Sequence, residues 1–214
     1  MRIQLMLIVI VIALLNFSIA SAQTKAATNR ALFENRGSLH EAAKAAGGRF
    51  VTSSTNLNGS IEYQDIKSLK RESSFVVVGT AVTNTCQLTP DGREVQTAYQ
   101  FRVEDVFKGH ARAGDMITVL LPGGRVSFED GSMVQINTPG FRLMVNGDRY
   151  VLFLRADHTN KAFLPTGGSQ GIFELQTDGT VVAHAQKEAV GKQSGKRELD
   201  FLDQLRSQAE GGKD

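Results

Sequence analysis

Apolar and polar side chains alternate along much of the chain between residues 75 and 185. VQTAYQFRV (95–103) has an apolar or small side chain at every second position, which predicts a strand with one buried face. FVVVGTAV (75–82) is apolar at almost every position, which is typical of a strand buried on both faces. Further strands are predicted in DMITVLLP (115–122), RVSFE (125–129), SMVQIN (132–137), DRYVLFLRA (148–156), GIFEL (171–175) and TVVAHA (180–185). The block therefore predicts seven or eight short antiparallel strands in a sandwich or small barrel.

The alternation changes phase in FRVEDVFKG. A regular strand would put Asp105, not Val106, on the same face as Val103. Because burial of an unpartnered carboxylate is costly, we expect a β-bulge within Glu104 to Val106 that leaves Asp105 exposed or hydrogen-bonded. A bulge bends the strand, and this favours a barrel over a flat sandwich. The predicted fold class is mainly β: a small antiparallel (OB-like) barrel with short flanking α-helices.

Turn signals separate the predicted strands. Asn146-Gly147 predicts a type I′ hairpin turn ahead of DRYVLFLRA, and Asp178-Gly179 predicts a turn between the last two strands. LPTGGSQG (164–171) lacks the lysine and the following helix of a phosphate-binding loop, so we interpret it as a turn. Other glycines that we interpret as structural are Gly123, Gly124 and Gly131.

Short helices are expected on both sides of the strands. Ser38 and Glu41 have capping-box spacing before an alanine-rich stretch that Gly47-Gly48 ends. Two more helices, in 61–73 and 196–208, would place apolar side chains on one face. These side chains are Ile61, Ile66 and Leu69 in the first helix, and Leu199, Leu202 and Leu205 in the second.

The first residues, MRIQLMLIVIVIALLNFSIASAQ, have the signature of a secretory signal peptide. Arg2 supplies the positive n-region, and Ala20-Ser21-Ala22 is a small-x-small cleavage pattern. The apolar run from Leu5 to Leu15 is shorter than the ~20 residues that span a bilayer, which favours cleavage after Ala22 over an uncleaved anchor. We therefore expect an exported protein, periplasmic or extracellular, with no stable membrane insertion after cleavage.

The expected domain organisation has four segments. Residues 1–22 are the signal peptide, and residues 23–60 are a poorly ordered lead-in with a short helix, in which TSSTNLNGS (52–60) has the composition of a loop. Residues 61–185 form the β-barrel domain with its preceding helix, and residues 186–214 form a C-terminal helix and tail.

Charge and cysteine content narrow the possible functions. The chain has 24 basic and 22 acidic residues, and loss of Arg2 brings the mature chain closer to neutrality. A balanced charge argues against a dedicated nucleic-acid surface. Cys86 is the only cysteine, so no intramolecular disulfide can form. We interpret Cys86 as a half-buried small side chain; a reactive thiol or an intermolecular bridge are the alternatives.

Three common catalytic and cofactor motifs do not occur in the sequence: HExxH, SxxK and the P-loop pattern. Glu104-Asp105 and Glu129-Asp130 are adjacent residues, which face opposite ways on a strand. No histidine has the short spacing to a second ligand that zinc sites usually show; the four are His40, His110, His158 and His184. We therefore assign no catalytic residue, metal ligand or cofactor from the sequence.

Taken in order, several short segments resemble a recurrent domain of exported bacterial proteins. They are FVVVGTAV, FRVEDVFKG, ITVLLPGG, PGF, GDRYVLFL and QGIFEL, and they span roughly residues 62–176. The pattern resembles VVxGxV, VxxVxKG, PGG, GxRYxLFL and QGxF. The FKG-ended strand is also similar to one in the OB-like barrel of tissue metalloprotease inhibitors and netrin modules. Those inhibitors block the protease zinc with an N-terminal cysteine ridge, and this chain has no cysteine near the predicted mature start.

Three hypotheses for function follow. The first is an exported, non-enzymatic β-barrel module that binds a protein or a cell-envelope component. The second is a protease-inhibitor-like barrel, which the second resemblance implies. The third is an enzyme whose site is assembled from distant loops, with His110, His158, Asp115 and Asp157 as the available residues.

Overall fold

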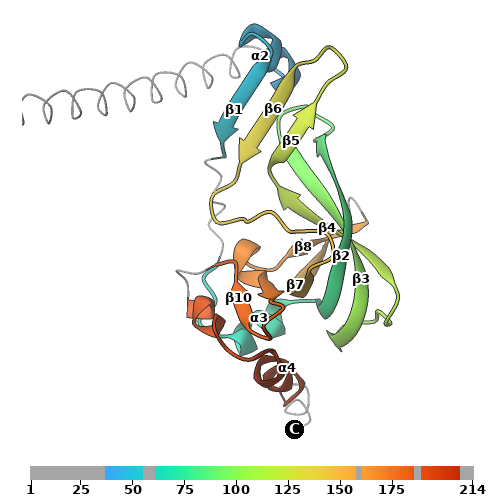
Figure 1. Cartoon of the computed structure of the whole chain (residues 1–214), viewed down its shortest axis with the longest axis vertical. Helices are drawn as coiled ribbons and strands as arrows, with labels where there is room; N and C mark the ends of the chain where they lie inside the picture. The colour runs from blue at the N-terminus through green and yellow to red at the C-terminus, as the bar shows by residue number, and fades with distance from the viewer. Residues whose placement is uncertain (1–36, 55–60, 158–160, 186–188, 208–214) are drawn as a thin grey trace, which may run out of the picture. The chain divides into compact units, whose positions relative to one another are not determined.

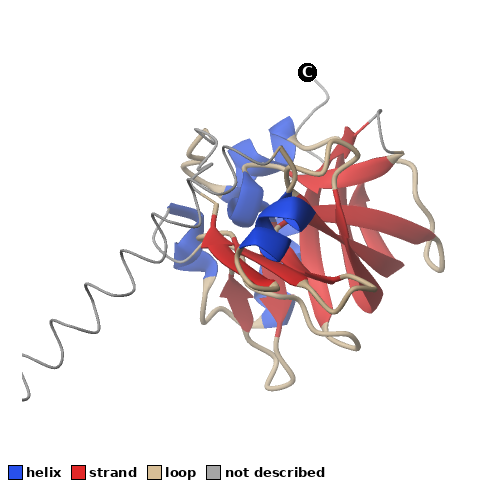
Figure 2. Cartoon of the chain, turned by 90° about the horizontal axis from the view of Figure 1, so that it is seen from above, coloured by secondary structure: helices blue, strands red, loops and turns tan. Residues whose placement is uncertain are grey.

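The computed structural model describes residues 37–54, 61–157, 161–185 and 189–207 (Figure 1). The fold is mainly β, as predicted, and the strands are drawn in red in Figure 2. The described strands are β1 (Arg49–Ser53), β2 (Phe75–Leu88), β3 (Val95–Lys108), β4 (Met116–Pro122), β5 (Gly124–Ser127), β6 (Met133–Asn137), β7 (Arg149–Asp157), β8 (Ala162–Pro165), β9 (Ile172–Leu175) and β10 (Val181–Ala183). The helices are α2 (Leu39–Ala45), α3 (Ile66–Glu72) and α4 (Glu198–Ser207), with 3-10 turns η1 (Gly168–Gly171) and η2 (Ala189–Gln193). None of these described helices has the length and apolar character needed to cross a membrane.

The described chain divides into two compact units. The first contains 37–53, 88–95 and 125–137, and the second contains the remaining described residues. The segments of β5 and β6, predicted as part of one β-barrel domain over 61–185, fall mainly in the first unit. The predicted signal peptide, 1–22, lies outside the described residues, and the predicted boundaries at 60 and 185 adjoin residues that are not described.

In the first unit the predicted helix cap at Ser38 is confirmed. Ser38 precedes α2 in an extended conformation, and its Oγ accepts a hydrogen bond from the Glu41 N–H at 3.2 Å. Gly47 and Gly48 follow the helix with positive φ angles, as a helix end requires. The helix packs its apolar side onto the strands; the buried residues of this core are Leu39, Ala42, Ala43, Phe50, Val95 and Val134.

The sequence did not predict β1. Residues 49–53 pair in parallel with β6, with Phe50 opposite Val134, so the predicted lead-in contains a strand, and Thr52 lies in that strand rather than in a loop. The strand has too few apolar residues for a periodic signal, and its partner is more than 80 residues away in the sequence. Its strand conformation therefore depends on hydrogen bonds to β6 rather than on local propensity.

The second unit contains the seven-stranded sheet, with the order β10-β9-β7-β2-β3-β4-β8. The β9–β10 pair is an antiparallel hairpin around Asp178-Gly179, as predicted. Strand β8 pairs with two strands: antiparallel with β7, where Leu154 is opposite Pro165, and parallel with β4, where Val119 is opposite Phe163. The sequence predicted antiparallel strands only, but β4–β8 and β1–β6 are parallel, and neither β8 nor β1 was among the predicted strands. No local turn joins the members of either pair, so the sequence carries no signal for their direction.

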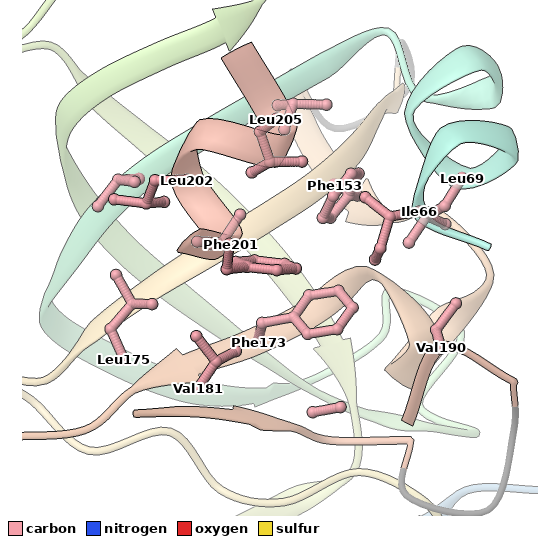
Figure 3. Packing of buried hydrophobic residues seen from close by; sticks show 14 of the residues in the cluster. Ile66, Leu69, Phe153, Phe173, Leu175, Val181, Val190, Phe201, Leu202 and Leu205 are labelled. Carbon is pink, nitrogen blue, oxygen red and sulfur yellow. The ribbon is translucent and has the colours of Figure 1, made fainter. Parts of the chain in front are cut away.

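Strands β2 and β7 bury both faces, as their continuous apolar sequences predicted. One face of the sheet packs against α3, α4 and η2, and we call this core the helix-side cluster (Figure 3). Its larger members are Ile66, Leu69, Phe153, Phe173, Val181, Phe201 and Leu205. The other face contributes to the opposite-face cluster, which includes Val77, Tyr99, Phe101, Val119, Met144, Tyr150, Leu152 and Ile172.

The change of phase in β3 is confirmed by packing. Val103 and Val106, three residues apart, both contact the opposite-face cluster, whereas Phe107 packs against the helix-side cluster. In a regular strand Val103 and Phe107 would share a face. Asp105 is half-exposed, and its carboxylate pairs with Arg206 at 3.2 Å. The chain thus keeps the carboxylate out of the core, as expected.

The turn at Asn146-Gly147 differs from the prediction. The Asp148 N–H donates to the Val145 carbonyl at 3.2 Å, so Asn146 and Gly147 are the central residues of a turn. Only Gly147 has a positive φ, at +95°, which fits type II and not type I′. No strand precedes this turn within residues 141–145, so it is not a hairpin. Its partner is β2, because the Gly147 N–H donates to the Ala81 carbonyl at 2.7 Å.

The predicted flanking helices are present but shorter. Helix α3 begins after Asp65, whose carboxylate accepts a hydrogen bond from the Ser68 N–H at 2.6 Å. Ile61 therefore lies before the helix and is exposed, which corrects its predicted place on the apolar face. In α4, Leu202 and Leu205 are buried as predicted, but Leu199 is exposed and Phe201 takes the buried position instead.

Candidate functional site

Several residues of the segments that resemble the exported bacterial domain stabilise the fold. Lys108 Nζ donates to the carbonyls of Lys70 and Arg71, at 3.0 and 2.8 Å, and so caps the end of α3. A Cβ on Gly171 would lie 2.6 Å from the Thr166 carbonyl oxygen and 2.7 Å from that of Phe153, so only glycine fits there. Lys108 and Gly171 therefore have structural roles.

Gln170 and Arg149, also in the pattern, act in the same way. The buried Gln170 amide accepts from the Tyr63 N–H at 2.8 Å and donates to the Ile61 carbonyl at 3.1 Å. Arg149 donates to the carboxylates of Glu104 and Glu198. Burial opposes ionisation of Glu104, but the Thr80 hydroxyl and the Arg149 guanidinium outweigh it and lower the Glu104 pKa.

The turn glycines all have positive φ angles, and one of them, Gly124, is also closely surrounded by side chains. Gly124 has a φ of +127°, and a Cβ there would lie 2.8 Å from Cys86 Sγ and would also collide with the Thr97 hydroxyl. Gly123, Gly131 and Gly147 have positive φ, as the structural interpretation requires. Cys86 is half-buried, as predicted, with its Sγ 3.2 Å from the Thr97 hydroxyl.

The histidines lie in separate surroundings. His40 Nε2 is 2.9 Å from the Asp130 carboxylate, and its ring stacks on Phe128 at a centroid distance of 3.8 Å. His110 is exposed, and His158 lies outside the described residues. His184 is buried at the end of β10. Among the described residues no group of three or more histidine, cysteine, aspartate or glutamate side chains could hold a metal ion.

Of the residues of the enzyme hypothesis, His110, Asp115 and Asp157 are described. The Asp115 carboxylate accepts from the Arg112 N–H at 2.9 Å, which stabilises its own loop. No hydrogen bond or ion pair joins His110 to Asp115, both of which are described. Asp157 is the last residue of β7. In the first unit Asp130 accepts from the Ser132 hydroxyl at 2.6 Å and from His40, so the aspartate lies between serine and histidine. A serine nucleophile needs histidine in that central place.

A different feature is the best candidate for a site: the segment TPGFRLMVNGD (138–148), which we call the PGF loop. Two buried tyrosines fix its backbone by hydrogen bonds. The Tyr99 hydroxyl accepts from the Met144 N–H at 3.3 Å, and the Tyr150 hydroxyl accepts from the Val145 N–H at 3.0 Å. The Met144 side chain is buried in the opposite-face cluster. The loop is therefore fixed at its centre by the core.

The loop is also fixed at its C-terminal end. The Ala81 N–H donates to the Asp148 carbonyl at 3.0 Å, next to the Gly147–Ala81 hydrogen bond of the turn. The Asn84 side-chain amide donates to the Asn146 amide oxygen at 3.3 Å. Strand β2 therefore contacts the C-terminal end of the loop through Ala81 and Asn84.

The PGF loop presents apolar side chains to solvent. Leu143 is 77% exposed and Val145 is 57% exposed. Arg142 is also exposed. Six large apolar residues of the described chain are exposed in this way; two belong to the loop, and a third, Val82, belongs to the neighbouring strand β2. A buried anchor between exposed apolar neighbours is an arrangement suited to contact with a partner.

Beneath the loop the polar groups are strongly desolvated. Burial raises the pKa of Tyr150 to about 12, and burial likewise raises the pKa of Tyr99, so both hydroxyls stay protonated at neutral pH. Burial and, to a smaller extent, the positive charge of Arg142 lower the pKa of His184 to about 4. The His184 and Tyr150 rings meet edge to face at a centroid distance of 6.1 Å.

Neither the scan against protein-family models nor the search of curated proteins found a match to this chain. The function must therefore be argued from the residues themselves.

The sequence did not predict that Tyr99, Tyr150 and His184 lie beneath the PGF loop. Alternation in its strand predicts a buried Tyr99, but no sequence pattern links Tyr99 to Tyr150 or to the loop. His184 follows an apolar strand, and its burial depends on β10 packing beside β9. The available hint was PGF followed by RLMV, where three consecutive apolar residues lie outside any predicted strand.

Proposed function

We propose that the protein is an exported, non-enzymatic β-barrel module that binds a protein or a cell-envelope component through the PGF loop. The observation that carries this proposal is the pair of exposed side chains, Leu143 and Val145, on either side of the buried Met144. Burial of an apolar side chain of this size stabilises a complex by roughly 1.5–3 kcal/mol. Because Tyr99 and Tyr150 already fix the backbone, little loop entropy is lost on binding.

A binding assay with the native cell envelope tests the proposal. Protein comprising residues 23–214 is titrated into isolated envelope fractions, and the bound fraction is measured by sedimentation. We expect saturable binding that the double variant Leu143→Ser/Val145→Ser weakens at least tenfold. The matched control is Leu199→Ser, an exposed leucine on α4. Equal binding by the loop variant and the wild type would exclude the loop as the recognition surface.

For the fold, we propose that β2, β3, β4, β8 and β7 form a closed, OB-like barrel. The support is the double pairing of β8, which makes each of these strands a neighbour of two others in the set. The opposite-face cluster would then be the barrel interior, with Val77, Phe101 and Val119 from three different strands. The strand order, with one parallel pair, is that of a five-stranded Greek-key barrel.

A second candidate function is protease inhibition, which one feature of the loop favours. Arg142 and Leu143 are consecutive exposed residues, and the next two amides are bonded to the core. A fixed, exposed segment of this kind can occupy a protease cleft. Titration against trypsin-like serine proteases and secreted metalloproteases tests it. Stoichiometric loss of activity that Arg142→Ala abolishes would support inhibition, and undiminished activity of every protease would exclude it.

A further inference from the structure

Within the described part of the chain, the buried His184 has no polar partner for its ring. The side chain is 4% exposed, and neither Nδ1 nor Nε2 has a hydrogen-bond partner there. Its backbone is fixed, because the His184 N–H donates to the Ile172 carbonyl at 3.0 Å. The neutral ring is tolerated in such a place, but an imidazolium would be buried with no acceptor for either of its protons.

The surroundings of His184 connect it to the PGF loop. Its ring meets Tyr150, the residue whose hydroxyl holds the Val145 N–H. The charged group that acts on His184 is Arg142, which belongs to the same loop. Glu174 of β9 and Asp148 of the loop act on Tyr150 and not detectably on His184. A proton on His184 would therefore meet a like charge carried by the loop, beside the tyrosine that anchors the loop.

We propose that His184 is an acid-sensitive latch: its protonation releases the PGF loop from Tyr150 and Tyr99 and so exposes the ring to solvent. This regulates the surface assigned under the proposed function, but the release itself takes place in the free protein. Failure of the latch and failure of partner binding are therefore measured separately.

The direction of the pH effect follows from linkage. In the closed state the pKa of His184 is lowered to about 4, and in an open, hydrated state the ring regains its ordinary value of 6.5. The open state then binds the proton more tightly, so opening becomes more favourable as the pH falls from 6.5 toward 4 and changes little below that. For these two values the opening equilibrium rises about a hundredfold between pH 7 and pH 4.

Amide hydrogen exchange of the free protein tests the latch. Protection of the Met144 and Val145 amides is measured between pH 7 and pH 4, corrected for the intrinsic pH dependence of exchange. We expect it to fall about a hundredfold in the wild type, while the amides of Leu152 and Phe173 in the central strands stay protected. In His184→Gln, which cannot be protonated in this range, the loss should vanish, and His110→Gln should behave as the wild type.

Three results would overturn the latch. They are pH-independent protection of the loop amides in the wild type, the same loss in His184→Gln as in the wild type, and equal loss at Leu152 and Phe173, which would mean global unfolding. Should His184→Gln fail to fold, an NMR titration of the wild-type ring decides. A His184 ring that titrates while the Val145 amide signal stays unchanged also contradicts the proposal.

Discussion

The Arg149 guanidinium and the Glu198 carboxylate lie 2.9 Å apart, and this ion pair joins the first residue of β7 to the first residue of α4. The same guanidinium is 2.9 Å from Glu104 of β3. Burial opposes the charge on Arg149, but its two carboxylate partners outweigh burial and raise its pKa. One side chain thus fixes a helix to two strands of the sheet.

We expect Arg149→Met to lower the free energy of unfolding by about 1–2 kcal/mol, because it leaves two carboxylates without their partner. The estimate is modest because Arg149 is 41% exposed and solvent screens the pair. Arg197→Met, which breaks an exposed pair with Asp200, should cost much less, because solvent screens that pair fully. Denaturant unfolding measures both; equal effects would show that Arg149 has no special role.

Alanine substitutions at two glycines distinguish the cost of a steric collision from the cost of backbone strain. A Cβ on Gly171 would collide with two backbone carbonyls, whereas a Cβ on Gly147 would meet nothing within 4 Å and suffer only from the positive φ. Gly171→Ala should therefore cost about 3 kcal/mol or more, and Gly147→Ala about 1 kcal/mol. The measurement is the shift in unfolding free energy. If Gly147→Ala proved the more damaging, the space around Gly171 would not be as described.

The sequence predicted features that depend on local order. The strands β2, β3 and β7, the cap at Ser38 and the slip at Asp105 all follow from neighbouring residues. The direction of the β4–β8 pair and the existence of β1 depend on segments far apart in the chain, so no local pattern encodes them. For Asn146-Gly147, the sequence permits both turn types, and hydrogen bonds to Ala81 select the observed one.

For the candidate site, even less was predictable. Burial of Tyr99 follows from alternation in its strand, but its contact with Met144 joins residues 45 positions apart. The unpartnered state of His184 is a property of packing, since an isolated histidine in a sequence gives no measure of its surroundings. Leu143 and Val145 lie outside every predicted strand, so alternation gives no expectation for them, and the structure shows that they are exposed.

A disulfide tests the β7–β8 pairing on which the closed barrel depends. Arg155 and Leu164 are directly opposite in the antiparallel register. In a Cys86→Ser background, Arg155→Cys/Leu164→Cys should form a disulfide under mild oxidation. Arg155→Cys/Phe163→Cys should not, because adjacent strand residues face opposite ways. Mass spectrometry of the alkylated protein measures the bond; faster oxidation of the second pair would contradict the register.

If the protein is exported as proposed, the first residue of the mature protein can be predicted. Mass spectrometry of protein recovered from the periplasm or medium should find Gln23 as the first residue, because Ala20-Ser21-Ala22 is a cleavage pattern. Ala22→Arg should block processing and leave the precursor in the membrane fraction. An intact Met1 on wild-type protein in a washed membrane fraction would reverse the prediction and indicate an uncleaved anchor.

The central claim, recognition through the PGF loop, is tested most directly by site-specific photo-cross-linking in the native cell envelope. A photoreactive phenylalanine analogue replaces Leu143 in one variant and the equally exposed Leu199 in another. The account predicts a discrete cross-linked species from position 143, which disappears when Val145→Ser is added, and none from position 199. Absence of an adduct from position 143, or the same adducts from both positions, would contradict it.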